Sequence, residues 1–203
     1  MMKFIANQPI ILASESPRRK ELLQELGIPF QAMKSNVIEN VESTPSSVHK
    51  YVTALAIEKT KAIAEYHTEK TVIGADTIVS FDGKVFPKPK DKEQAKQFLQ
   101  TLSGQTHLVI TAVAVMHAGE IHSFSSETKV TFYELDDAMI DAYIETGDCS
   151  DKAGAYGIQS GGLLFVKAIN GDYYSVMGLP VAQLSRVLQN IGAITLKGSV
   201  RDE

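Results

Sequence analysis

The chain is poor in cysteine and in long apolar runs. Cys149 is the single cysteine among 203 residues, so no internal disulfide can form and a disulfide-stapled secreted fold is excluded. The longest uncharged apolar run covers 108–116, which is far too short to cross a membrane. Residues 1–13 hold only a short apolar run, unlike a signal peptide. We therefore expect a cytoplasmic protein with no membrane partner.

The chain also lacks an excess of positive charge. It has 20 Lys and Arg against 24 Asp and Glu, which gives a formal net charge of −4. This balance is typical of a globular protein and argues against a nucleic-acid partner, which usually meets a basic face. A local basic pocket for a nucleotide remains compatible with an acidic chain. With no repeat or linker, the length predicts one domain over 1–191 and a frayed C-terminal tail over 192–203.

Several familiar active-site patterns are missing as well. The sequence has neither the G-x-x-x-x-G-K-[ST] phosphate loop nor the G-x-G-x-x-G dinucleotide fingerprint. It has no G-x-S-x-G elbow and no H-E-x-x-H pair. The histidines show no zinc-like grouping with Cys149, and we expect them on the surface or in hairpins: His49, His67, His107, His117 and His122.

Hydrophobic periodicity and turn residues predict alternating strands and helices. Expected strands cover 9–13, 72–79, 84–86, 106–116, 120–132 and 163–169. Expected helices run from Ser16 to Gly27, over 46–67, from Asp91 to Leu102, from Asp136 to Gly147, and onward from Val181. Asp82-Gly83 predicts a hairpin, and Asn170-Gly171 turns the chain into 173–177. Hairpins among helices indicate an α/β fold with a mixed sheet.

Charged residues in unusual places mark candidate functional residues. Arg18 and Arg19 lie in the first turn of a predicted helix, where the helix dipole and the backbone N–H groups already favour an anion such as phosphate. The alternative is a solvated turn in which Arg18 pairs with Glu21. Lys59 interrupts the apolar stripe of the helix predicted over 46–67, so its ammonium either snorkels to the rim or faces an anion across a pocket.

A second set surrounds the strand predicted over 72–79. Asp76 lies within this buried strand, where an ionised carboxylate must be paired, hydrogen-bonded or bound to metal. Lys88 stands between two prolines that stiffen its backbone, which suits phosphate binding, although an ordinary loop lysine gives the same pattern. The glycine-rich stretch 151–162 permits close approach of the backbone to a ligand, and Gln159 there offers both a donor and an acceptor to a base edge.

These places also carry a family resemblance. The chain resembles the Maf proteins from Ile10 to about Leu188, through LASESPRR (12–19), IGADT (73–77), LSG (102–104) with His107, DKAGAYGIQ (151–159) and the segment 171–180. The resemblance implies an elongated mixed α/β fold with two lobes around a central cleft, similar to that of the inosine triphosphate pyrophosphatases. It implies a nucleoside triphosphate pyrophosphatase with a divalent metal, Mg²⁺ or Mn²⁺, a homodimer, and a link to septum formation.

Within that family, Arg18, Thr77 and Gln159 resemble the branch that acts on dTTP and UTP. The branch that acts on 7-methyl-GTP typically has an aromatic residue in place of the first arginine. The chain departs from the family at Pro87-Lys88-Pro89, where Gly-Lys-Pro is usual, and at Ile38-Glu39, where an acidic pair is common.

The resemblance and the chemistry together suggest a role for each candidate. Asp76 is the general base for the attacking water or a ligand of the metal that activates it, and Glu39 is the second carboxylate near the metal. The triphosphate is held by Ser14, Arg18, Arg19, Lys59 and Lys88, while Thr77 and Gln159 discriminate the base. Two alternatives remain: a related pyrophosphatase that prefers 7-methyl-GTP or inosine triphosphate, or a non-catalytic nucleotide-binding regulator of septum formation.

Overall fold

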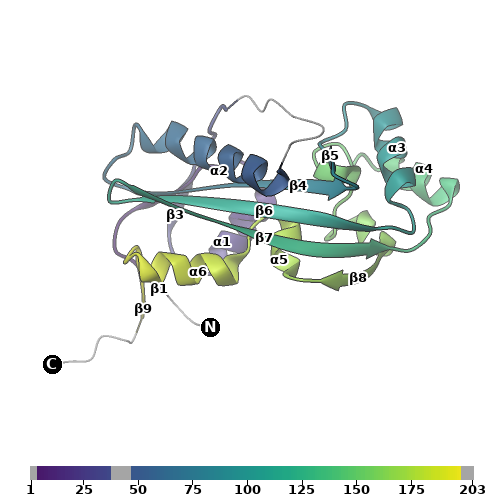
Figure 1. Ribbon diagram of the computed structural model, residues 1–203. Helices are drawn as coiled ribbons and strands as arrows, with labels where there is room; N and C mark the ends of the chain where they lie inside the picture. Colours follow the sequence, from purple (N-terminus) through teal and green to yellow (C-terminus); the bar gives the residue numbers. More distant parts are fainter. Residues whose placement is uncertain (1–3, 38–46, 198–203) are drawn as a thin grey trace.

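A computed structural model of the chain describes residues 4–37 and 47–197. Glu39, the predicted second carboxylate, lies outside the described residues. The described chain is elongated, and its long axis follows the central strands of a sheet (Figure 1). Among the described helices, none is both long enough and apolar enough to cross a membrane.

The main sheet has seven strands, of which six follow the order β3-β2-β4-β6-β7-β8 and β5 pairs with β4. Their bounds are β3 (Phe30–Ala32), β2 (Ile10–Leu12), β4 (Thr71–Phe81), β6 (Thr106–His117), β7 (Glu120–Phe132), β8 (Val166–Asn170) and β5 (Lys84–Phe86). Strand β2 runs parallel to β3 and β4, whereas the other pairs are antiparallel. The predicted mixed sheet is therefore confirmed. Asp82 and Gly83, both with positive φ, form the predicted hairpin between β4 and β5.

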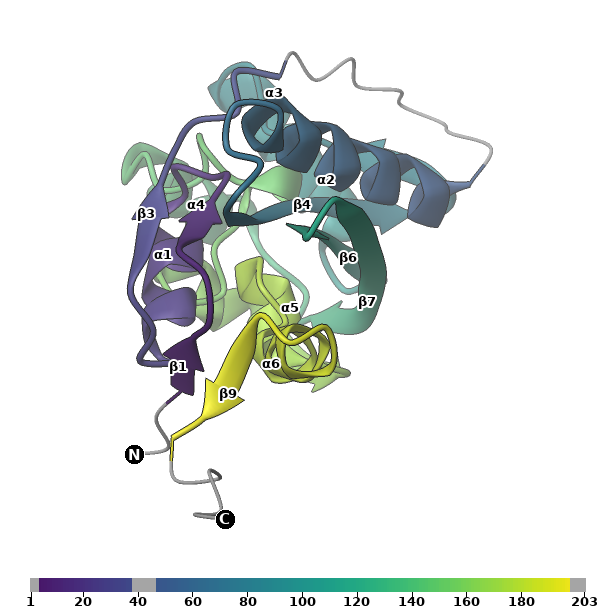
Figure 2. The same ribbon diagram turned by 90° about the vertical axis from the view of Figure 1, so that its left-hand side faces the viewer.

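Helices cover both faces of this sheet. Helix α2 (Val48–Ala64) lies over β4 and β6 on one face, and α1 (Pro17–Gln24), α5 (Tyr173–Met177) and α6 (Val181–Asn190) lie on the other (Figure 2). Helices α3 (Lys92–Leu102) and α4 (Asp137–Glu145) pack against each other at one end, beside the short 3₁₀ turns η1 (Ala153–Ala155) and η2 (Gly161–Phe165).

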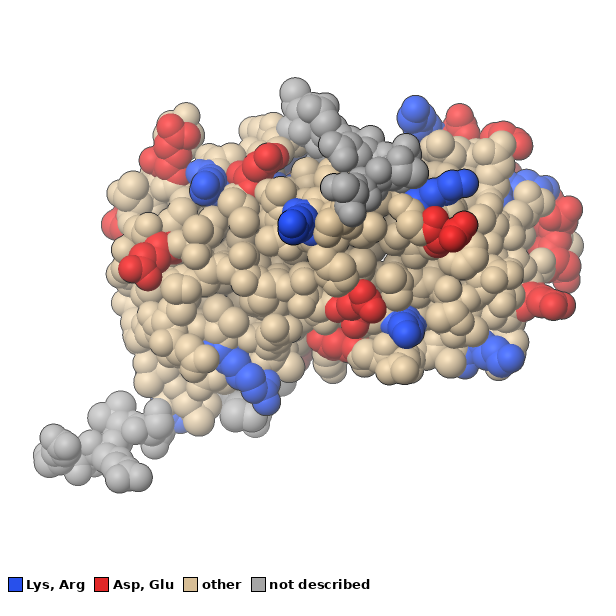
Figure 3. Space-filling view, viewed as in Figure 1, with Lys and Arg blue, Asp and Glu red and all other residues tan. Residues whose placement is uncertain are grey.

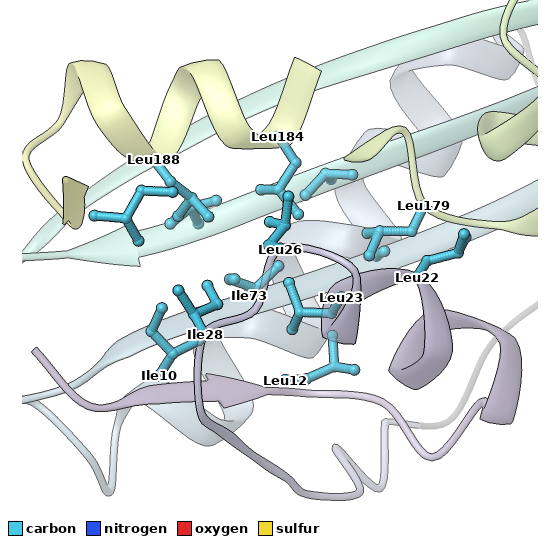
Figure 4. Close-up of a cluster of buried hydrophobic side chains, with 14 of the residues drawn as sticks. Ile10, Leu12, Leu22, Leu23, Leu26, Ile28, Ile73, Leu179, Leu184 and Leu188 are labelled. Carbon is cyan, nitrogen blue, oxygen red and sulfur yellow. The ribbon is translucent and has the colours of Figure 1, made fainter. Parts of the chain in front are cut away.

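Two large hydrophobic cores lie toward opposite ends of the long strands. The first joins β2, α1 and α6, whose side chains point toward one another in Figure 4, including Ile10, Leu23 and Leu184. The second packs α3 and α4 against β6 and β7, around Leu99, Phe132 and Ile140. Separate cores at the two ends correspond to the two expected lobes.

Strand β4 connects the lobes, and one of its edges is only partly paired. On one edge it pairs with β6 continuously, from Val72 opposite Met116 to Ser80 opposite Leu108. On the other edge β2 pairs with residues 71–73 and β5 with residues 79–81. Residues 74–78 therefore present an edge that no strand of this sheet covers, and Asp76 is at its centre.

Two details of the chain path differ from expectation. Residues 194–196, assigned to a tail that begins at 192, form strand β9 (Ile194–Leu196), which pairs with β1 (Phe4–Ala6), so that boundary is wrong for this segment. Ile194 packs in the first core rather than remaining in solvent. The strand predicted over 163–169 begins later, at Val166, because residues 161–165 form the 3₁₀ turn η2.

Candidate active site

A cavity of about 430 Å³ opens at the uncovered edge of β4, between the two cores. Its walls come from the loop before α1 and the first turn of that helix, from α2, from β4, from the loop after β5 and from residues 151–158. The cavity brings together most of the predicted site residues: Ser14, Arg18, Arg19, Lys59, Asp76, Thr77 and Lys88. On the face of the molecule shown in Figure 3, acidic and basic side chains are interspersed.

Asp76 and Lys59 form a buried ion pair in the cavity wall. The Lys59 Nζ atom donates to Asp76 Oδ1, and the two side chains are 10% and 8% exposed. Lys59 therefore does not snorkel out to solvent. Gly74 makes the approach possible, because a Cβ atom there would lie 2.2 Å from Thr60 Oγ1 and 3.0 Å from the Ala56 carbonyl oxygen of α2. A carboxylate and an ammonium are thus held together where a ligand can reach them.

Arg19 is anchored on three sides. Its Nε donates to the Gly178 carbonyl oxygen at 2.8 Å, NH1 to Ser14 Oγ at 3.4 Å and NH2 to Thr77 Oγ1 at 3.0 Å. These bonds tie the first turn of α1 to β4 and to the end of α5. Ser16 and Pro17 occupy the N-cap and first helical position, as predicted, although the Ser16 side chain makes no capping hydrogen bond.

Arg18 points toward the opposite wall. Its NH1 lies 3.8 Å from Asp151 Oδ2, so the expected alternative partner, Glu21, is replaced by a residue far away in the sequence. Burial acts to raise the pKa of Asp151, but the hydrogen bond from Lys152 and the charges of Lys152 and Arg18 outweigh it and hold that pKa below its ordinary value. Asp151 thereby orients Arg18 at the cavity.

Lys152 is a wall residue that the sequence analysis did not select. It is buried, and its Nζ donates to the Asp148 carbonyl oxygen at 2.6 Å and to Asp151 Oδ1 at 2.7 Å, with Asp148 Oδ1 at 2.9 Å. Its stem leaves no room for a side chain at Gly157, where a Cβ atom would lie 2.5 Å from Lys152 Cε. The four-residue spacing of Asp148 and Lys152, directly before a glycine-rich loop, was the available signal.

His107 corrects the expectation that the histidines lie on the surface or in hairpins. It is 1% exposed, and its Nε2 lies 2.8 Å from the hydroxyl of Tyr156, which lines the cavity. Burial lowers the pKa of His107 to about 4 and raises the pKa of Tyr156 far above its ordinary value. Alternation along β6 places His107 on the same inward face as Val109, and it supports the cavity wall from behind.

The remaining predicted residues are placed differently. Lys88 is exposed at the rim, and the Pro87 carbonyl oxygen beside it accepts from Gly154 N at 3.3 Å. Gln159 is exposed and does not line the cavity, although its neighbours Gly157 and Ile158 do. Within residues 4–37 and 47–197, no group of three or more His, Cys, Asp or Glu side chains comes together as a metal centre.

The family model and the curated relatives that match this chain agree with one another. The family model described as Maf-like protein matches residues 9–191. The dTTP/UTP pyrophosphatase of Bacillus cytotoxicus is 51% identical over 181 residues, which span 88% of this chain and 93% of the relative. The dTTP/UTP pyrophosphatase of Bacillus cereus strain AH187 is 48% identical over 182 residues, 89% and 94% of the two chains.

Among solved structures, the Staphylococcus aureus Ham1 protein superimposes with a TM-score of 0.44 and 15% identity, over 63% of this chain and 73% of that one. A nucleoside-triphosphatase / dITP/XTP pyrophosphatase from Mycobacterium abscessus superimposes with a TM-score of 0.40 and 16% identity, over 63% and 75% of the two chains. Both likenesses are partial.

Proposed function

The chain belongs to the Maf-like protein family, and on that premise we propose that it hydrolyses dTTP and UTP to the monophosphate and pyrophosphate. The curated relatives that match nearly its whole length carry that activity in their names. The observation that carries the proposal is the buried Asp76 carboxylate on the open edge of β4, in a cavity that two arginines and four lysines also line.

The cavity suits attack of water on the α-phosphorus of a nucleoside triphosphate. Such a reaction depends on positioning the nucleophile and neutralising charge on the phosphate oxygens. In this proposal Asp76, which lines the cavity, accepts a proton from the attacking water or binds the metal that activates it. Arg18, Arg19 and Lys59 supply fixed cations around it, and Lys88 adds another at the rim.

We propose that the enzyme also requires Mg²⁺ or Mn²⁺. These ions typically bind through one or two protein carboxylates together with substrate phosphates and water, so the Asp76 carboxylate, which lines this cavity together with Glu15 and Asp151, fits such a site. Glu39 would be the second carboxylate. When bound, the metal would neutralise phosphate charge and acidify a water molecule.

We assign base choice to Thr77 and Gln159. Thr77 lines the cavity beside Arg19, which supports its role. For Gln159 the support is indirect, because only its two preceding neighbours reach the cavity wall. A cytoplasmic location, a homodimer and a link to septum formation complete the proposal; light scattering of the purified protein tests the dimer.

The direct test is pyrophosphate release from a panel of canonical and modified nucleoside triphosphates, with Mg²⁺, Mn²⁺ or EDTA. We expect metal-dependent release that favours dTTP and UTP. Asp76→Asn should lower turnover by roughly 10²–10⁴-fold while nucleotide binding is retained, because the carboxylate that would accept the proton is lost while the cations that would hold the triphosphate remain. Wild-type turnover in Asp76→Asn would refute the role of Asp76.

The same panel separates the alternatives. Preferential release from 7-methyl-GTP or inosine triphosphate would keep the chemistry and overturn the assignment of the base. Binding without release from any nucleotide would indicate a regulator rather than an enzyme.

A further inference from the structure

A chain of side-chain hydrogen bonds leads from the cavity into the protein interior. Arg19 NH2 lies 3.0 Å from Thr77 Oγ1, and Thr77 Oγ1 lies 2.8 Å from Thr111 Oγ1. Thr111 Oγ1 in turn lies 2.7 Å from the Ser175 carbonyl oxygen in the middle of α5. Thr111 is fully buried on β6 and does not line the cavity.

The chemistry of the two ends fixes the direction of every bond in this chain. A carbonyl oxygen can only accept, so Thr111 donates its one hydroxyl proton to the Ser175 carbonyl oxygen. Thr111 must therefore accept in its contact with Thr77, whose own proton points inward. A guanidinium can only donate, so Thr77 accepts from Arg19.

This direction limits what Thr77 can offer to a ligand. Its proton is committed to Thr111 and one lone pair to Arg19, which leaves a second lone pair. Phosphate oxygens of an ionised triphosphate are acceptors and cannot use that lone pair. A base N–H, a sugar O–H or a water can. These hydrogen-bond directions therefore favour contact of the Thr77 hydroxyl with the nucleoside part of the substrate rather than with its phosphates.

We propose that Thr111 is a positioning residue of the active site. Its hydroxyl orients the hydroxyl of Thr77, and Thr77 in turn holds Arg19 in place. The proposal rests on the proposed function, since it concerns how substrate is held. Gly178 supports the arrangement from the other side, because a Cβ atom there would lie 3.3 Å from Arg19 Nε and 3.4 Å from Thr77 Oγ1.

The test is a double-mutant cycle on kcat/KM for UTP. Thr111→Val keeps the side-chain shape and removes the hydroxyl; we expect kcat/KM to fall about tenfold, as for one lost hydrogen bond, while Thr111→Ser restores it to within about twofold. Thr77→Val should also lower kcat/KM. Because Thr77→Val already breaks the chain of hydrogen bonds, adding Thr111→Val to it should lower kcat/KM by less than about twofold.

A matched control is Thr128→Val on the adjacent strand β7. Thr128 is also fully buried; its hydroxyl donates to the carbonyl oxygen of Asp172, the N-cap residue of α5, at 3.1 Å and accepts from Asp172 N at 2.9 Å. This variant loses an equivalent buried hydrogen bond without touching Thr77, so its kcat/KM should stay within about twofold of wild type.

The outcomes separate the two proposals. No pyrophosphate release by the wild type would refute the proposed function. With an active wild type, an unchanged kcat/KM in Thr111→Val, or an equal loss in both Thr77 backgrounds, would overturn the positioning role. If Thr111→Val does not fold, NMR of the wild type decides: the Thr111 hydroxyl proton should show contacts to α5, and contacts to Thr77 instead would overturn the assigned direction.

Discussion

Removal of the Lys59 ammonium should destabilise the protein strongly. Lys59→Met leaves Asp76, whose side chain is 8% exposed, without the cation that Lys59 Nζ brings to it. Breaking a buried pair by deleting one partner costs about 3–5 kcal/mol, and the lower end applies here because the pair borders a cavity that water can enter. For a protein of this size, about 3 kcal/mol lowers the melting temperature by roughly 6–12 °C.

Urea unfolding followed by circular dichroism measures this loss. The double variant Lys59→Met/Asp76→Asn should recover at least half of it, since no charge is then left buried, yet it should release no pyrophosphate. Lys96→Met is the control, because Lys96 pairs with Asp141 on the surface of α3 and α4 and its loss should change the unfolding midpoint little. A Lys59→Met protein as stable as the wild type would contradict the argument.

Three further predictions concern residues around the cavity. Because burial lowers the pKa of folded His107 from 6.5 to about 4, its contribution to stability is complete above pH 6.5 and is lost as the pH falls toward 4. That contribution is about 3 kcal/mol, and urea titrations of His107→Gln should show a correspondingly shallower decline between these pH values. Gly74→Ala should cost about 1–3 kcal/mol in the same assay and reduce pyrophosphate release, because its Cβ atom would press on α2 and shift Lys59. Gln159→Ala should alter the ranking of nucleotides in the release panel; an unchanged ranking would remove Gln159 from the base-reading site.

Local sequence patterns anticipated most of the architecture. Periodicity located α2 and the strands β4, β6 and β7, and Asp82-Gly83 identified the hairpin, because these features depend on neighbours within a few residues. Asp76 was recognisable as a candidate for the same reason: a carboxylate inside an otherwise apolar strand needs a partner wherever the rest of the chain runs. The family resemblance also belongs to this level.

The partners themselves required the tertiary structure. Periodicity left two positions open for the Lys59 ammonium, at the rim or in a pocket, and the closeness of α2 to Gly74 decided between them. Arg19 finds the Gly178 carbonyl oxygen 159 residues away, which no local pattern encodes. The same holds for the pairing of β9 with β1 near the opposite end of the chain.

His107 and Lys152 show why a local sequence pattern does not reveal a buried polar residue. The alternating pattern around His107 indicates which residues share a face of β6, but only the packing of Phe132 and Tyr156 around it makes that face a closed interior. Lys152 resembles a solvated lysine until the turn after α4 folds back over it. A sequence records which face of an element avoids water, whereas the path of the whole chain decides what that face meets.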